Sequence, residues 1–143
     1  MQNFDLNKIL PSKTVLVVED DEISFLVLSE YLKKFNFKVV RASNGIEAVS
    51  LVKSREEFFG LILMDILMPL MNGFEAAEKI RKIDKNIPII AQTAVAFDWN
   101  NEVDFSNFDQ ILIKPLDFKK LEELINSTVN KKNLSNMLEF QAN

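Results

Sequence analysis

The 143-residue chain contains neither cysteine nor histidine, and these two absences exclude much of protein chemistry. Without cysteine there is no disulfide framework, no thiol nucleophile and no thiolate metal site. Without histidine there is no imidazole base, which excludes Ser-His-Asp and Cys-His catalysis and most transition-metal sites. Any chemistry of this chain therefore depends on carboxylates, hydroxyls, lysines and a hard metal ion.

Long apolar runs and an excess of basic residues are also missing. No apolar run approaches the roughly 20 residues that span a bilayer, and residues 1–11 lack the basic and apolar regions of a secretory signal. We therefore expect a cytoplasmic location and no membrane insertion. The chain carries 17 Lys and Arg against 21 Asp and Glu, a net charge of −4, without a basic stripe. This balance argues against direct binding of nucleic acid.

The composition is that of one globular domain. Hydrophobic residues make up 48% of the chain and charged residues 27%, as in soluble proteins of ordinary size. We predict an N-terminal extension over residues 1–13, a domain over residues 14–130, and a C-terminal tail or linker over residues 131–143. The last segment is polar with scattered apolar residues, and either a linker or a disordered end fits it.

Short apolar runs alternate with amphipathic stretches along the predicted domain. The apolar runs favour buried strands, and apolar residues at helical spacing favour helices. The predicted strands are Thr14–Val18, Phe37–Arg41, Leu61–Met64, Ile87–Ala91 and Ile111–Ile113. The predicted helices are Glu22–Phe35, Asn44–Ser54, Gly73–Ile83 and a last helix capped by Asp117. Residues 96–109 are rich in Asp and Asn, so a helix there is expected to be short or frayed.

Strands that are apolar on both faces need helices on both faces. We therefore predict an α/β fold of the flavodoxin-like type, a doubly wound five-stranded parallel sheet in the order 2-1-3-4-5. Ligands of such sheets bind at the carboxyl ends of the strands, where the strand order reverses between strands one and three.

Acidic residues follow the two strands that meet at this point. Glu19 and Asp20 come after the first strand, and Asp65 comes after the third. Three carboxylates that lie close together repel one another, and a hard divalent cation bound between them offsets this repulsion. Mg²⁺ takes oxygen ligands and keeps several waters, so one or two direct carboxylates suffice.

Phosphoryl transfer is the chemistry that this set of residues favours. With a cation in place one carboxylate can attack phosphorus, and the reaction then needs mainly positioning and neutralisation of charge. The Lys114 ammonium and the Thr93 hydroxyl, which follow the fifth and fourth predicted strands, can each hold a phosphoryl oxygen. Taken singly, these residues have ordinary interpretations: Glu19 and Asp20 as acids at a helix start, and Lys114 as a solvated strand-end lysine. Asp21 and Glu22 are expected only to cap the first helix and favour its dipole.

Four segments carry a resemblance to a known family. VLVVEDDEIS (15–24), LILMDILMPLMNGFEA (61–76), IIAQTA (89–94) and ILIKPL (111–116) resemble the signature blocks of response-regulator receiver domains. The resemblance covers about Thr14 to Val129, and the style of the motifs leans toward receivers attached to hybrid histidine kinases. It implies a signalling switch rather than an enzyme, with a histidine kinase or histidine phosphotransfer protein as phosphodonor.

The resemblance also assigns roles to individual residues. It implies an acidic pair, a phosphoacceptor, a backbone ligand to Mg²⁺, a switch hydroxyl, a phosphate-binding lysine and a cis Lys114–Pro115 bond. These roles fall on Glu19 (through water) and Asp20 (direct) as the acidic pair, Asp65 as acceptor and ligand, the Leu67 carbonyl, Thr93, and Lys114.

One departure from the family and one pair of apolar residues bear on how this chain would signal. Ile111 stands where the family usually has an aromatic switch residue, so coupling of that residue to Thr93 cannot operate in its usual form. Leu67 and Val95, two positions beyond Asp65 and Thr93, are apolar and cannot hydrogen-bond an attacking water. We therefore expect slow autodephosphorylation.

Three other functions are alternatives to a phosphorelay receiver. A pseudo-receiver would use the same fold only to bind proteins. A phosphatase of the haloacid dehalogenase type has Asp two residues after its nucleophile, where this chain has Leu67. A flavodoxin that binds FMN places hydroxyls and amides after its first strand, where Glu19, Asp20 and Asp21 would repel phosphate.

Overall fold

A computed structural model of the chain describes residues 12–94 and 104–142, with side chains up to residue 132. It contains one five-stranded parallel sheet in the order β2-β1-β3-β4-β5. The strands are β1 (Thr14–Val18), β2 (Lys38–Ala42), β3 (Leu61–Asp65), β4 (Ile89–Thr93) and β5 (Gln110–Ile113). The helices are α2 (Glu22–Lys33), α3 (Gly45–Ser54), α4 (Gly73–Ile83) and α5 (Phe118–Ala142). The predicted fold class and strand order are confirmed.

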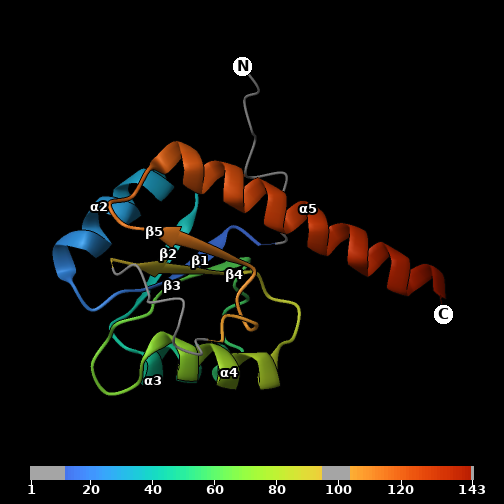
Figure 1. Ribbon diagram of the computed structural model, residues 1–143, viewed down its shortest axis with the longest axis horizontal. Coiled ribbons are helices and arrows are strands. Elements are labelled where there is room, and N and C mark those ends of the chain that lie inside the picture. Colours follow the sequence, from blue (N-terminus) through green and yellow to red (C-terminus); the bar gives the residue numbers. More distant parts are fainter. Residues whose placement is uncertain (1–11, 95–103, 143) are drawn as a thin grey trace.

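Helices cover both faces of the sheet, with α2 and α5 on one side and α3 and α4 on the other (Figure 1). The alternation of side chains along each strand divides the buried residues into two cores. Val15 and Val17 of β1 belong to the core under α2 and α5. Leu16 and Val18 belong to the core under α3 and α4. This two-sided burial explains why the central strands are apolar throughout.

Polar side chains cap all four described helices, and at α4 the Asn72 side chain accepts a hydrogen bond from the Glu75 N–H at 3.0 Å. The Asp21 carboxylate accepts hydrogen bonds from the Ser24 backbone N–H at 2.8 Å and from the Ser24 hydroxyl at 2.7 Å, which confirms its predicted role as a cap of α2. Asn44 caps α3 through the Glu47 N–H, and the Asp117 carboxylate accepts from the Lys119 and Lys120 N–H groups of α5. These bonds satisfy N–H groups that the first turn of a helix leaves without partners.

Four of the five predicted strands differ from the observed strands by one or two residues. β3 and β5 each include one further residue, Asp65 and Gln110. The fourth strand runs over Ile89–Thr93 and not from Ile87, because Pro88 has no N–H to offer a central strand. Thr93 therefore lies within β4 and not just after it. The second strand runs over Lys38–Ala42 and not from Phe37.

The C-terminal helix is longer than the prediction. It continues to Ala142, so the residues from 131 to 142 are helical. The physical reason is that residues 118–142 contain neither glycine nor proline, the two residues that most often end a helix. Figure 1 shows α5 crossing the sheet and continuing beyond it. None of the helices in the described ranges combines the length and hydropathy needed to cross a membrane.

Some predictions fall on residues outside the described ranges. These are most of the N-terminal extension over residues 1–13, the role of Val95, and residues 96–103 of the irregular stretch. The described remainder of that stretch, residues 104–109, forms turns and no helix.

Gly73 brings the start of α4 against the end of β3. Its N–H donates to the Ile66 carbonyl at 2.9 Å. A Cβ at this position would lie 2.5 Å from the Asp65 carbonyl oxygen and 2.9 Å from the Ile66 Cα. Because both neighbours are backbone atoms of the segment that carries Asp65, only glycine lets the helix approach this closely.

We predict that Gly73→Ala destabilises the protein by about 1–3 kcal/mol, the usual cost of overpacking a buried position. Urea denaturation monitored by circular dichroism measures the change. Lys79→Ala, at an exposed position of the same helix, is the control and is expected to stay within about 0.5 kcal/mol of wild type. A Gly73→Ala protein as stable as wild type would contradict the prediction, because it would show that the backbone between β3 and α4 can shift to accommodate a methyl group.

Candidate phosphoacceptor and metal site

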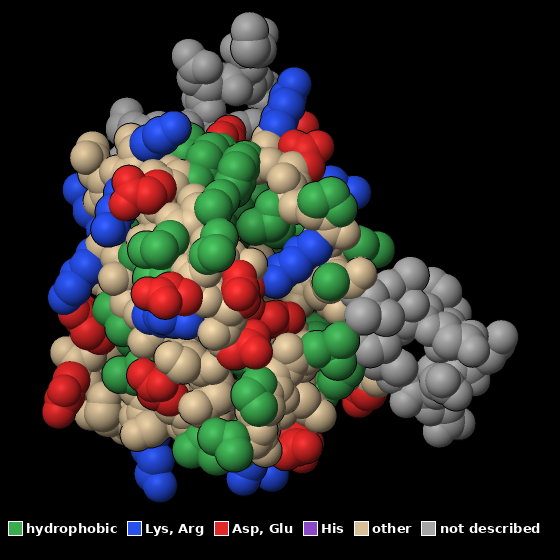
Figure 2. All heavy atoms as spheres, turned by 90° about the vertical axis from the view of Figure 1, so that its left-hand side faces the viewer, with side chains coloured by type: hydrophobic (Ala, Val, Ile, Leu, Met, Phe, Trp, Pro, Cys, Tyr) green, Lys and Arg blue, Asp and Glu red, His purple; other side chains and the backbone are tan. Residues whose placement is uncertain are grey.

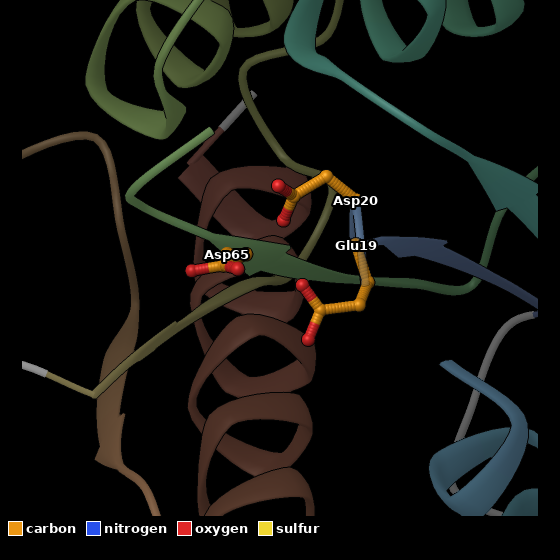
Figure 3. Close-up of side chains that lie close together, drawn as sticks. All are labelled: Glu19, Asp20 and Asp65. Atoms are coloured by element: carbon orange, nitrogen blue, oxygen red, sulfur yellow. The ribbon is translucent and has the colours of Figure 1, made fainter. Parts of the chain in front are cut away.

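Three carboxylates meet where β1 and β3 end side by side. Val18 of β1 pairs with Met64 of β3, so the residue after β1 and the last residue of β3 reach the same edge of the sheet. Glu19, Asp20 and Asp65 each offer a carboxylate oxygen, and these oxygens lie within 4.8 Å of one another. Figure 3 shows Asp65 at the end of β3, with Glu19 and Asp20 beside it in the segment after β1. The predicted convergence of these three residues is thus present in the structure.

The lysine that follows β5 lies against two of these carboxylates. Lys114 Nζ is 2.6 Å from Glu19 Oε1 and 3.6 Å from Asp65 Oδ2. Glu19 is only 2% exposed and Asp65 7% exposed, whereas Asp20 lies at the surface. The Lys114–Pro115 peptide bond is cis, as expected.

Burial and the neighbouring charges shift the pKa values of Glu19 and Lys114. Burial raises the pKa of Glu19, the adjacent Asp65 carboxylate raises it further, and Lys114 opposes both effects. Burial by itself would lower the pKa of Lys114, but its hydrogen bond to Glu19 and the charge of Asp65 outweigh burial and raise it. Lys114 is therefore held in its charged form by the carboxylates that it neutralises.

The cluster fits a hard divalent cation. All three side chains offer oxygen, the ligand atom that Mg²⁺ and Ca²⁺ prefer. Glu19 Oε2 is buried and accepts no hydrogen bond from the described part of the chain. A buried carboxylate oxygen without a partner is costly, and a cation or a water bound to it supplies the missing interaction.

The remaining predicted site residues lie around the cluster. Thr93, 1% exposed, is the last residue of β4, and its carbonyl accepts from the Lys114 N–H at 2.8 Å. The Leu67 N–H donates to Asp65 Oδ1 at 3.3 Å, while its side chain is 52% exposed. The roles of the Thr93 hydroxyl and of the Leu67 carbonyl stay predictions.

One residue at the site was not expected from the sequence. The Arg41 guanidinium of β2 donates hydrogen bonds to the backbone carbonyls of Glu19 and Asp20. Arg41 lies outside the four signature segments, and a basic residue near the end of a strand has no distinctive pattern. Only the pairing of β2 with β1 brings it to the acidic segment.

A doubly wound parallel sheet with a carboxylate cluster and a lysine at its switch point is the arrangement of receiver domains. Residues 15–126 match the response regulator receiver domain family, and the chain belongs to this family. Receiver domains are signalling switches and not classical enzymes. Because the chain belongs to this family, it is neither a phosphatase of the haloacid dehalogenase type nor an FMN-binding flavodoxin.

Relatives by sequence include sensor kinases, hybrid histidine kinases and transcriptional regulators. The chain is 33% identical over 132 residues to the autoinducer 1 sensor kinase/phosphatase LuxN of Vibrio campbellii. That match covers 91% of this chain and 15% of LuxN, so the chain spans only a small part of this relative.

Solved structures of receiver domains share the fold. The receiver domain of the sensor histidine kinase PA1611 from Pseudomonas aeruginosa, which has a magnesium ion coordinated in its active-site cleft, is 26% identical, with a TM-score of 0.74. The match covers 83% of this chain and 98% of that domain. The response regulator TrrA from Thermotoga maritima, in complex with Mg²⁺ and BeF, is 31% identical, with a TM-score of 0.68, over 80% of this chain and 97% of TrrA.

We predict that Mg²⁺ stabilises the wild-type protein against thermal unfolding, by about 2.7 kcal/mol at a free concentration 100 times its Kd. Asp20→Asn is expected to abolish most of this gain, because it removes a charged ligand from the cluster. Asp21→Asn makes the same change of charge one residue further on, and Asn is also a good helix cap. It serves as the control, and an equal loss of the Mg²⁺ effect in both variants would argue against a specific site. Differential scanning calorimetry at several Mg²⁺ concentrations measures the effect.

Proposed function

We propose that this chain accepts a phosphoryl group on Asp65 from a phosphohistidine, with the help of Mg²⁺, and changes conformation as a result. The observation that carries the proposal is the position of Asp65. Carboxylate oxygens of Asp65, Glu19 and Asp20 lie within 4.8 Å of one another, and Asp65 Oδ2 lies 3.6 Å from Lys114 Nζ. A nucleophilic carboxylate, two further acids and a lysine are what phosphoryl transfer to aspartate needs.

In the proposed reaction an Asp65 carboxylate oxygen attacks phosphorus and forms an acyl phosphate. The P–N bond of the donor imidazole breaks and its electron pair returns to the nitrogen. Because the other ring nitrogen carries a proton, the leaving group is neutral histidine. Lys114 is then placed to bind a phosphoryl oxygen, and we assign a second to the Thr93 hydroxyl. Bound Mg²⁺ supplies neutralisation of the phosphoryl charge, with Glu19, Asp20, Asp65 and the Leu67 carbonyl as the groups that would hold it.

The phosphodonor must come from another protein or another domain, because the chain has no histidine. We propose a histidine kinase or a histidine phosphotransfer protein, acting in the cytoplasm. Ile23, Leu26 and Val27 of α2 are each at least half exposed, and α2 begins at the cap beside the acidic segment. Figure 2, which faces the strand ends, shows hydrophobic side chains next to a group of acidic ones. An apolar surface beside the acceptor is suited to contact such a donor.

We predict that incubation with Mg²⁺ and acetyl phosphate adds about 80 Da, the mass of one phosphoryl unit, to the intact protein. Asp65→Ala is expected to abolish the adduct, and omission of Mg²⁺ to suppress it. Asp84→Ala, which changes an exposed acid at the end of α4, is the control and should be modified like wild type. Intact-mass spectrometry provides the measurement.

The same experiment tests the second candidate function. Ile111 in place of an aromatic residue motivates a pseudo-receiver, which binds proteins without phosphorylation, and Ile111 lies half-buried in β5. No adduct in wild type, with the protein folded and Mg²⁺ present, would favour the pseudo-receiver. The retained carboxylates and Lys114 are the reason we favour phosphorylation.

We predict that the acyl phosphate is long-lived, because the apolar side chains of Leu67 and Val95 cannot orient an attacking water. The variant Leu67→Asn, Val95→Glu should shorten the half-life by about tenfold, the lower range for general acid–base assistance. Leu70→Asn is a matched control in the same loop: Leu70 is 81% exposed, and Asn tolerates its left-handed backbone with φ of 70°. Equal half-lives in wild type and the double variant would refute the explanation.

A further inference from the structure

The acidic segment after β1 needs its backbone fixed if its carboxylates are to bind a cation. Glu19, Asp20 and Asp21 are consecutive, and their charges repel one another and Asp65. The two ends of the segment are held: the Glu19 N–H donates to the Ala42 carbonyl at 3.0 Å, and Asp21 caps α2. The carbonyls of Glu19 and Asp20 lie between these two anchors.

Arg41 holds both of these carbonyls. Its Nη2 donates to the Glu19 oxygen and to the Asp20 oxygen, each at 3.2 Å, and its Nε donates to the Glu19 oxygen at 3.3 Å. A guanidinium can do this because its donors form a planar fork. A lysine ammonium has no such fork and would hold one carbonyl well at best.

The fold determines the direction in which the guanidinium N–H groups of Arg41 point. Arg41 pairs with Val17 in the β1–β2 ladder, and the residue after Val18 is Glu19. On the side of α2, the Arg41 guanidinium carbon lies 5.0 Å from the centre of the Phe25 ring, a cation–π contact. Arg41 is half-buried between this ring and the acidic segment. Two contacts from different elements therefore fix where its donors point.

Charge alone would give Arg41 the opposite effect on a cation. A guanidinium beside a divalent ion repels it, so a purely electrostatic Arg41 would weaken metal binding. Groups that orient the ligands of a metal, by contrast, strengthen its binding without touching it.

We propose that Arg41 is a positioning residue, which holds the Glu19 and Asp20 backbone so that their carboxylates are preset for the divalent cation. The inference rests on the proposed function, since it concerns the same metal site. It assigns to β2, a strand that contributes no side chain to the phosphoryl chemistry, control over the affinity for Mg²⁺.

Isothermal titration calorimetry with Mg²⁺ alone tests the proposal. Arg41→Met removes charge and fork together, and we expect Kd to rise about tenfold, the lower range for loss of an orienting group. Arg41→Lys keeps the charge and loses the fork, and Kd should rise less than in Arg41→Met, by about threefold, because a lysine ammonium still holds one of the two carbonyls. Phe25→Leu removes the ring without any change of charge and should also raise Kd. Lys82→Met removes a distant, exposed charge on α4 and should leave Kd unchanged.

A second readout separates positioning from general damage to the fold. At saturating Mg²⁺ the rate of phosphorylation by acetyl phosphate should stay within about twofold of wild type, since Asp65, Thr93 and Lys114 are untouched and acetyl phosphate transfer depends on them. Only the Mg²⁺ concentration for half-maximal rate should rise. If Arg41→Met does not fold, as judged by circular dichroism, Arg41→Lys and Phe25→Leu still decide the question.

The outcomes separate this inference from the proposed function. Tighter Mg²⁺ binding in Arg41→Met, or an unchanged Kd in Arg41→Lys and Phe25→Leu, would overturn the inference and leave the metal site in place. A wild-type protein that does not bind Mg²⁺ would overturn the proposed function, and the inference with it.

Discussion

The repulsion between carboxylates at the ends of β1 and β3 is the constraint on which the rest of the site depends. Parallel pairing of these strands forces Glu19 and Asp65 to the same edge, where neither is more than 7% exposed. Lys114 offsets part of this repulsion, and it is nearer to Glu19 than to Asp65. A single ammonium cannot balance three carboxylates, which is why the site favours a divalent cation.

The surrounding backbone fixes these charges in place. Gly73 lets α4 pack directly on the carbonyl of Asp65, Asp21 starts α2 immediately after the acidic pair, and Arg41 holds the carbonyls between. Each of these contacts comes from a different element of the fold. Groups that would repel one another in solution are therefore preorganised before any ligand arrives, which is how folded sites gain affinity.

The sequence was sufficient for the parts of the fold that depend on local pattern. Buried strands, the cap at Asp21 and the strand order follow from apolar runs, helix spacing and the rules of parallel sheets. The start of β4 was misplaced because Ile87 continues the apolar run, while Pro88 removes an N–H that the sheet requires. The contacts of Arg41 could not be foreseen, since they depend on the β1–β2 register and on a ring of α2. The same holds for the preference of Lys114 for Glu19.

The two ends of β5, the strand that contains Ile111, have different surroundings. β5 carries Lys114 directly after its last residue and Asp109 directly before its first. Asp109 forms ion pairs with Arg81 of α4 at 2.9 Å and with Lys132 of α5 at 3.2 Å. Ile111 lies between these ends and has no aromatic ring, so it cannot couple to Thr93 in the way expected of the family's aromatic switch residue. Under the proposed phosphorylation, any displacement of β5 would disturb an ion-pair network that joins α4 to α5, and because this network is partly buried, its geometry is costly to change.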